Sequence, residues 1–343
     1  MKIVKSIILV FINYIFIYAS TPIEYSLHLD SGYDSNVMRF SHEEFSEAYI
    51  DRQIMGGENT FDSFIYRLGI KGEKSIWNKG KKNIFIGGNY FWSNYNNNKH
   101  KKYWSGGFDL TFKWGPYNNF KYVLRNLNSY YLRHYINRDI SVSDMAPCFF
   151  SDRNQKLVLT KRINRSHWFS VGYGYLQRYY DRPFTEFDLD IYYLHFRINK
   201  KIKKIINISF QIEPYQAKDF FNENKYLPSN FHRSYESLEW YIPVSIKLDN
   251  IFVEKTGFSF KKESRYYEAE DPDDPLHTGR GHIDSKYDFW IKKGLLETVS
   301  ITLSARYRTR KTQSAYDWVK ELKSFEQIQF WFNIDWDLVY DRY

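Results

Sequence analysis

The stretch from residue 330 to residue 340 constrains the fold more than any other part of the chain. Its apolar members are Phe330, Phe332, Ile334, Trp336, Leu338 and Tyr340, and Asn333, Asp335 and Asp337 lie between them. An extended strand points alternate side chains to opposite faces. One face of this strand is therefore mostly aromatic, while the other carries carboxylates. A soluble sheet can alternate in this way, but a mostly aromatic face favours a strand that lies between lipid and water.

The same alternation recurs along the whole chain and predicts about fourteen strands. The clearest interior example is residues 104–114, where Trp104, Phe108, Leu110 and Phe112 alternate with polar residues and Trp114 ends the stretch. Further alternating stretches begin near residues 23, 64, 206, 238 and 299. We therefore expect an all-β chain in which each strand has one apolar face and one polar face.

The connections between these strands alternate in length. Short turns are predicted at residues 75–81, 115–118, 164–166, 200–204, 249–250 and 292–294. Long loops are predicted at residues 38–61, 136–153, 216–232, 268–284 and 310–323. A β-sandwich or propeller has no reason to keep this asymmetry, whereas a transmembrane barrel has short turns on one side and long loops on the other. The pattern predicts a transmembrane antiparallel up-and-down β-barrel over residues 21–343, with both termini on the short-turn side.

One local motif carries a resemblance to a known group of proteins. Residues 32–37 read Gly-Tyr-Asp-Ser-Asn-Val at the end of an early predicted strand. This stretch resembles that of several Gram-negative outer-membrane barrels, including the barrel domain of surface lipoprotein assembly modifiers, and the terminal strand resembles the last strand of such barrels. The resemblance implies a location in the cell outer membrane with both termini periplasmic. It also implies contact with outer-membrane lipid and with the barrel assembly machinery.

The first twenty residues have the character of a secretory signal peptide. Lys2 and Lys5 precede a short apolar run, and small residues follow near position 20. The alternative is a retained transmembrane anchor, for which a run interrupted by Asn13 is short. Beyond residue 20 no window approaches the 18 to 20 apolar residues of a membrane helix, which excludes a helical membrane protein. The single cysteine, Cys148, allows no intramolecular disulfide.

The composition raises a further alternative, a nucleic-acid binder. Aromatic residues make up 20% of the chain and the net charge is +9, and stacking rings in a basic groove are typical of proteins that bind single strands. Export would separate the chain from nucleic acid, so we expect no nucleic-acid partner. Interface girdles of a barrel account for the aromatic residues instead.

Charged residues on the predicted inner faces are the candidate pore-lining residues. They are Arg67, Lys71, Lys113, Lys121, Arg125, Arg178, Arg306, Arg308, Asp335 and Asp337. One interpretation is a basic wall that favours anionic solutes. The other is that bases and acids, among them Glu213 and Glu239, pair with one another and keep the lumen wet. The function predicted is a porin-like channel or small-solute transporter; the alternative is a non-transporting barrel for surface-structure assembly, partner export or adhesion.

Two other groups of residues have side chains that could form a site. The acidic loop at residues 268–275, followed by His277, His282 and Asp284, has carboxylates for a hard cation but lacks the spacing of a calcium loop, so a solvated surface loop is expected. His28 and His195 could point inward near Ser26 and Asp190, but their spacing indicates no nucleophile, base and orienting acid. We therefore predict no metal site, no cofactor, no catalytic residue and no enzyme activity.

Overall fold

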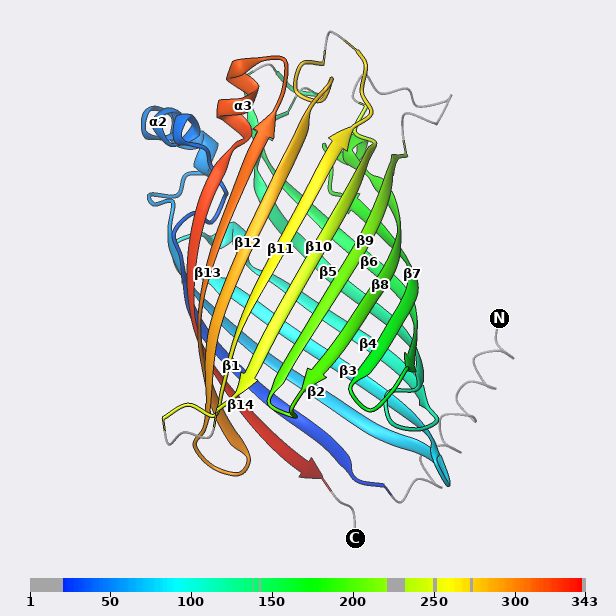
Figure 1. Cartoon of the computed structure of the whole chain (residues 1–343). Coiled ribbons are helices and arrows are strands. Elements are labelled where there is room, and N and C mark those ends of the chain that lie inside the picture. Colours follow the sequence, from blue (N-terminus) through cyan, green and yellow to red (C-terminus); the bar gives the residue numbers. More distant parts are fainter. Residues whose placement is uncertain are drawn as a thin grey trace, which may run out of the picture.

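The computed structural model describes residues 21–137, 139–141, 143–220, 232–248, 252–271 and 274–340. Fourteen antiparallel strands close into one barrel in which each strand pairs with its sequence neighbours and β1 pairs with β14 (Figure 1). The strands are β1 (Ile23–Asp34), β2 (Ser63–Lys79), β3 (Lys82–Tyr95), β4 (Tyr103–Lys113), β5 (Asn119–Ile136), β6 (Met145–Arg162), β7 (His167–Tyr180), β8 (Leu189–Ile202), β9 (Ile206–Asp219), β10 (Tyr235–Lys247), β11 (Lys255–Tyr267), β12 (Gly281–Gly294), β13 (Val299–Gln313) and β14 (Phe325–Tyr340). The predicted fold and the predicted strand number are confirmed.

Side-chain exposure follows the alternation that predicted the strands. On β1, Leu29 is 48% exposed whereas its neighbour Asp30 is 4% exposed. In the ladder Asp30 lies opposite Arg67 of β2 and Asn333 of β14, so the three share the inner face. The outer face carries a belt of exposed apolar side chains that includes Leu27, Leu29, Leu68, Ile70, Phe108, Leu110, Phe120, Leu157, Leu159, Leu194, Phe196, Ile198, Phe289, Leu303, Phe330 and Phe332.

Both ends of the described chain lie at the short-turn end of the barrel. Ile23, the first residue of β1, is paired with Tyr340, the last of β14. The longer connections and the helices gather at the opposite end (Figure 1). The α-helices are α2 (His42–Ile50) and α3 (Asp317–Lys323), and the 3-10 helices are η1 (Arg52–Met55), η2 (Lys99–Lys101) and η3 (Thr185–Phe187). Within the described ranges, neither α-helix has the length and apolar character needed to cross a bilayer.

Several predicted boundaries need correction. The loop predicted at residues 136–153 is much shorter, because β6 already begins at Met145 and includes Pro147 and Cys148. Proline suggested a loop, but here Pro147 pairs with His134 near the end of a ladder that has already shifted register twice. The turn predicted at 292–294 lies at residues 295–298. The turn at residues 249–250 and the signal peptide at residues 1–20 fall outside the described residues.

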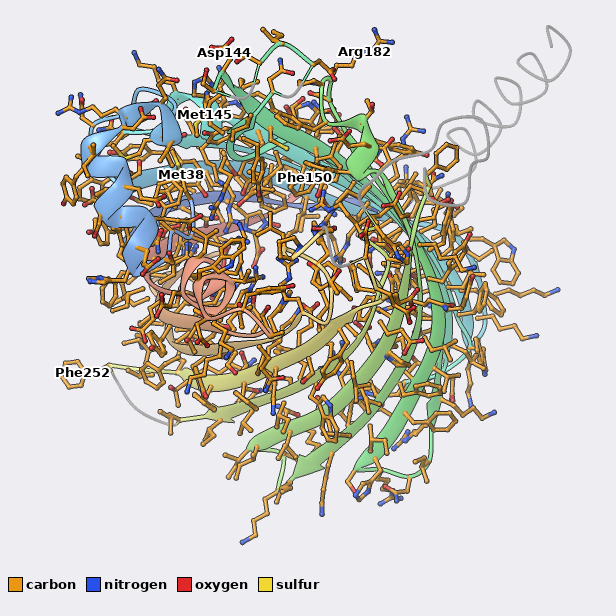
Figure 2. The ribbon with its side chains drawn as sticks, turned by 90° about the horizontal axis from the view of Figure 1, so that it is seen from above. Met38, Asp144, Met145, Phe150, Arg182 and Phe252 are labelled. Atoms are coloured by element: carbon orange, nitrogen blue, oxygen red, sulfur yellow. The ribbon has the colours of Figure 1, made fainter. Side chains whose placement is uncertain are left out.

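Two predicted loops contain short helices. In the loop at residues 38–61, Ser41 accepts a hydrogen bond from the Glu44 backbone N–H, while the Glu44 carboxylate accepts one from the Ser41 N–H. This capping box begins α2 where the sequence shows little apolar periodicity. In the last loop, predicted at 310–323, β13 continues to Gln313 before α3. Seen down the barrel, α2 and α3 lie over the same side of the rim (Figure 2).

Candidate functional site in the barrel lumen

The ladder places all ten candidate pore-lining residues on the inner face of the barrel wall. Five of them make close ion pairs with an acid on a neighbouring strand. The pairs are Arg67 with Asp30 (2.5 Å), Lys121 with Asp109 (2.9 Å), Arg178 with Asp152 (2.8 Å), Arg306 with Asp288 (2.5 Å) and Arg308 with Asp284 (2.6 Å). These cations are therefore neutralised locally, along the wall rather than across the lumen.

Among the described residues, the other five candidates form no ion pair this close between a carboxylate and a lysine or arginine. Lys113 lies 3.9 Å from Glu73, and the Lys71 ammonium lies 5.5 Å from the centre of the Phe91 ring. Arg125 is opposite Gly107 in the ladder. The remaining two are the acids: Asp335 lies 3.6 Å from Lys292 and also contacts His28, while Asp337 is opposite Ser26 near the short-turn end.

The inner acids are also partnered. Glu213 of β9 accepts hydrogen bonds from Lys156 (2.9 Å) and Tyr215 (2.5 Å), and the imidazole Nδ1 of His195 lies 2.6 Å from it. Glu239 pairs with Lys261 at 2.6 Å. Asp190, which the sequence suggested as a partner of His195, instead accepts from the Tyr175 hydroxyl at 2.8 Å. Asp190 shares the outer-face parity of its neighbour Tyr192, so strand alternation separates it from His195.

Ser26, His28 and Asp335 form a hydrogen-bonded row that the sequence spacing did not reveal. The imidazole Nε2 of His28 lies 2.9 Å from Ser26 Oγ, and its Nδ1 lies 2.5 Å from Asp335. The row arises because His28 is directly opposite Asp335 in the seam between the first and last strands. Its connectivity is that of a nucleophile, a base and an orienting acid. However, β1 is hydrogen-bonded along both edges, so its backbone N–H groups are not free to form an oxyanion hole.

A concentration of lumenal charge lies around a cavity of about 690 Å³ that we call the arginine chamber. Met38 and Phe150, which belong to its lining, are labelled in the view from above (Figure 2). Its cationic lining comes from four strands and four connections. These cations are Arg39, Arg133, Arg178, Arg233, Arg265, Arg280, Arg308, Arg310 and Lys323. Asp152, Glu186 and Glu263 are the acids that line it. Only Arg178 and Arg308 of these cations were among the candidates from the sequence.

Some of the chamber's cations are paired with acids in its wall. Asp284 receives two hydrogen bonds from Arg308, at 2.8 and 2.6 Å, and one from Arg310 at 2.9 Å. Arg265 donates to Glu263 at 2.6 Å, and Arg133 pairs with Glu44 of α2. Since Asp284 is fully engaged by two guanidinium groups, it is not available to a metal ion. Among the described residues no cluster of metal-ligating side chains is present.

Four chamber cations make no ion pair with a described carboxylate: Arg39, Arg233, Arg280 and Lys323. Two of them rest on aromatic rings instead. The guanidinium carbon of Arg233 lies 4.0 Å from the centre of the Phe187 ring, and that of Arg280 lies 4.1 Å from the centre of the Tyr267 ring. A ring face stabilises a cation without accepting its N–H hydrogens. The positive charge and some of the donors therefore remain available to the cavity.

The segment from Asp34 to Ser41 turns inward and carries Arg39 to the chamber. Asn36, 2% exposed, donates to the carbonyls of Phe40 and Glu326, both at 2.9 Å, and accepts from the Phe40 N–H at 2.8 Å. Arg133 donates to the carbonyls of Met38 (3.1 Å) and Arg39 (3.0 Å). Arg39 has a φ of 58°, a conformation uncommon for residues other than glycine. The anchored turn holds it there.

Burial sets the protonation of two groups outside the strands. Burial, together with the charge of Arg133, lowers the pKa of Lys323 to about 8, so its ammonium is still largely protonated at pH 7. Burial also lowers the pKa of His277 to about 4, which leaves this imidazole neutral at pH 7 beside Asp274, 2.7 Å away. The acidic loop therefore places a neutral histidine in the chamber wall. Pro272 and Asp273 of that loop fall outside the described residues.

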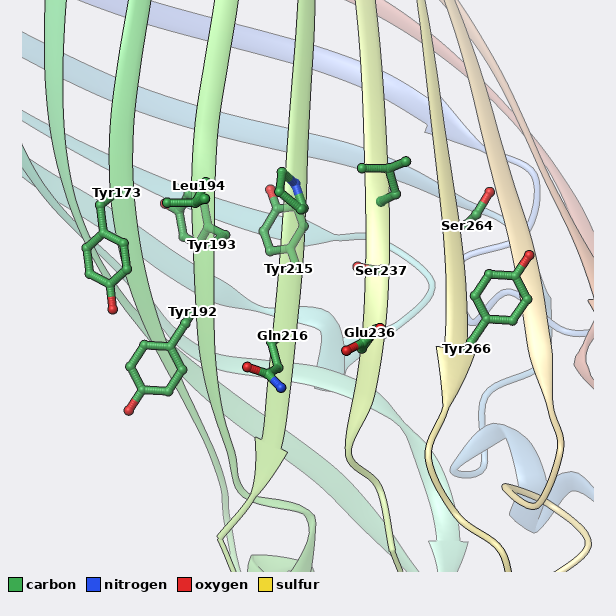
Figure 3. A pocket seen from close by; sticks show the side chains of 12 residues that line it. Tyr173, Tyr192, Tyr193, Leu194, Tyr215, Gln216, Glu236, Ser237, Ser264 and Tyr266 are labelled. Atoms are coloured by element: carbon green, nitrogen blue, oxygen red, sulfur yellow. The ribbon is translucent and has the colours of Figure 1, made fainter.

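A second hollow, of about 500 Å³, lies at the barrel wall around Pro214 of β9. Tyr173, Tyr192 and Tyr266 border it from the exposed outer face, whereas Tyr193 is buried and Tyr215 is half-buried on the inner side (Figure 3). Proline lacks the N–H needed for the ladder, and the β8–β9 pairing is interrupted between Tyr215 and Ile212. The hollow is shallow and carries one carboxylate, Glu236, so it has none of the chamber's positive charge.

Comparisons with known proteins find likeness in structure but not in sequence. No family model matches the chain, and no curated protein matches its sequence. A bacterial polysaccharide outer membrane secretin covers 92% of this chain over 98% of its own, at 8% identity and a TM-score of 0.47. A loop-deletion form of OmpT, an outer membrane protein of Vibrio cholerae, covers 93% over 100% of its own, at 7% identity and a TM-score of 0.47. An anion-selective porin from Comamonas acidovorans covers 93% over 100%, at 8% identity and a TM-score of 0.43. At these values the likeness does not extend to substrate or mechanism.

Proposed function

We propose that this protein is a porin-like channel or small-solute transporter of the outer membrane. The observation that carries the proposal is that the two faces of one closed barrel differ in polarity. The outer face is an exposed apolar belt, and the inner face is a charged, hydrogen-bonded wall. A closed barrel satisfies every strand edge, which is the condition for a β-sheet to lie in lipid. The polar inner wall in turn requires water.

The dimensions support passage rather than a filled interior. Eight-stranded barrels are filled by their own side chains, whereas barrels of 16 to 18 strands enclose an aqueous channel, so fourteen strands leave room for a lumen that loops narrow. In this barrel the anchored segment at residues 34–41 contributes Met38 and Arg39 to the lining of the arginine chamber. We propose that the ten inner residues predicted from the sequence line the path of the solute: Arg178 and Arg308 in the chamber, and the other eight between the chamber and the short-turn end.

The placement in the cell follows from the same proposal. The sequence of residues 1–20 supports removal of a signal peptide, leaving residues 21–343 as the barrel. Short turns face the periplasm in barrels of this kind, so both termini are assigned to the periplasm and the chamber to the outer surface. The partners are then outer-membrane lipid, the barrel assembly machinery and small solutes. We assign no enzyme activity, because the row at His28 has no set of free backbone donors beside it.

Single-channel recording in a planar bilayer tests this function. Purified, folded protein is expected to give steady open-pore current steps, while heat-denatured protein added in the same detergent gives none. A silent bilayer, with the barrel shown to be inserted by protease protection, would overturn the proposal. That result would favour the alternative of a non-transporting barrel used in surface-structure assembly, partner export or adhesion. The helices over the rim would then be the expected contact surface for the partner.

A further inference from the structure

We propose that the arginine chamber binds a small organic polyanion, a solute that carries at least two phosphate or carboxylate groups. The proposal deepens the channel function and relies on it only for how the solute reaches the chamber. It rests on three observations about the chamber: cations without carboxylate partners, donors without acceptors, and a backbone arranged to add one more cation.

The first observation is that two of the cations without carboxylate partners contact aromatic rings. Carboxylates neutralise Arg67, Lys121 and Arg306 lower in the barrel, so these three cations have little charge left for a solute. In the chamber, aromatic rings support Arg233 and Arg280 instead. A ring supplies attraction without a compensating negative charge. The chamber thus retains positive charge that an incoming anion can neutralise.

The second observation is that several buried donors have no acceptor. Among the described residues, Nη1 of Arg233, Nε of Arg280 and Nε of Arg310 have no hydrogen-bond partner, although Arg280 is only 8% exposed. His282, 4% exposed, likewise has an unpartnered Nε2. Buried polar atoms are nearly always hydrogen-bonded, so several unsatisfied atoms around one cavity indicate that an acceptor-rich group belongs there.

The third observation is that a hydrogen-bonded turn in the loop after β1 places Arg39 in the chamber lining. Three hydrogen bonds of Asn36 and two of Arg133 hold the segment in a turn in which Arg39 has a positive φ. Unusual backbone conformations that the surroundings enforce are concentrated at functional sites. Here the result is a further cation in the chamber lining that makes no ion pair with a described carboxylate.

The chemical class follows from the donors. A guanidinium group matches the paired oxygens of carboxylate and phosphate, whereas a halide ion cannot accept two parallel N–H bonds in the same way. Because Arg39, Arg233, Arg280 and Lys323 approach the cavity from different elements, one monovalent group does not reach all of them. A solute with two or more acidic groups does, and a volume of about 690 Å³ accommodates one of modest size.

Calorimetric titration of the folded barrel in detergent tests the site without requiring conduction. Pyrophosphate is the probe for phosphate groups, citrate is the probe for carboxylate groups, and maltose is the uncharged control. We expect saturable binding of one or both anions in the presence of 100 mM chloride and none of maltose. Absence of anion binding up to 10 mM would overturn the proposal. A barrel that binds but does not conduct refutes the channel alone, and one that conducts but does not bind refutes the site alone.

Variants assign the binding to the chamber. Arg233→Gln and Arg280→Gln should each weaken binding by about tenfold or more, the usual effect of losing a charged hydrogen bond. The matched control is Arg306→Gln, which removes the same charge from a lumenal arginine outside the chamber and should change affinity less than threefold. Equal losses in all three variants would mean that only the overall lumenal charge matters. Arg280→Lys, which keeps the charge and the fold, should still weaken binding because it removes the planar donors.

Discussion

Replacing Asn36 with alanine should release the inward-turned segment while leaving the barrel closed. The substitution removes three buried hydrogen bonds, two to the backbone of Phe40 and one to the carbonyl of Glu326. Each is worth about 1 kcal/mol net, so the segment should lose about 3 kcal/mol of local stability. Since 1.4 kcal/mol is a factor of ten in an equilibrium constant, local opening should increase about 100-fold.

Amide hydrogen exchange of the peptide around Phe40 measures this opening directly. The Phe40 N–H is protected by the Asn36 side chain, so its exchange should accelerate by about two orders of magnitude while peptides from β4 and β10 stay unchanged. Asn59→Ala is the matched control, because Asn59 is exposed and, among the described residues, its side chain accepts a hydrogen bond from Arg52 alone. An acceleration below about threefold in Asn36→Ala, or equal acceleration across the strands, would refute the anchoring role.

Three further predictions concern the outer face, the chamber and the row at His28. Leu110→Arg, on the exposed face of β4, should lower the free energy of unfolding in lipid by about 2 to 4 kcal/mol, measured by urea unfolding in vesicles. Thr111→Arg, which faces inward, should lower it by less. The reverse order would contradict a lipid-facing belt. Citrate binding should weaken about fivefold from pH 7 to pH 9 as Lys323 loses its proton, for a distance of about 8 Å between its ammonium and a bound carboxylate and an effective dielectric constant near 40. Lys323→Met should make this pH dependence smaller. A fluorophosphonate probe should not label Ser26, and labelling lost in Ser26→Ala would establish hydrolase chemistry at the row.

The barrel could be predicted because the residues at every second position of each strand face lipid and are mostly apolar. Strands that separate lipid from water must alternate throughout, as Phe330 and Asn333 do in β14, so an error at one end of a strand does not change the fold. The strand ends toward the long loops were harder. There β5 and β6 continue past the apolar belt. The ladder from Met145 to Phe150 is stabilised by packing against Tyr130, Phe184 and Phe187 rather than by alternation.

The chamber could be predicted only in part. Arg178 and Arg308 follow strand parity and were identified, but Arg265 and Arg310 lie on the same inner faces and were overlooked. The extension of the Arg306 and Arg308 alternation to Arg310 was the available signal. Arg39, Arg233 and Arg280 lie in connections, where no periodicity tells which way a side chain points. Their convergence depends on the three-dimensional closure of the barrel.

The seam between β1 and β14 determines when the barrel can become complete. His28 and Asp335 are 307 positions apart, and the contacts of Asp34 and Asn36 with residues 326–329 span nearly as much of the chain. Contacts of such separation form late, because the whole intervening chain must first be arranged. Until then both seam strands expose unpaired edges that invite aggregation. Until β1 and β14 pair, their open edges therefore need a temporary partner. The hydrogen bonds of Asp34 and Asn36 with residues 326–329 can form only after β14 is in place, so they stabilise the barrel at the last step of closure.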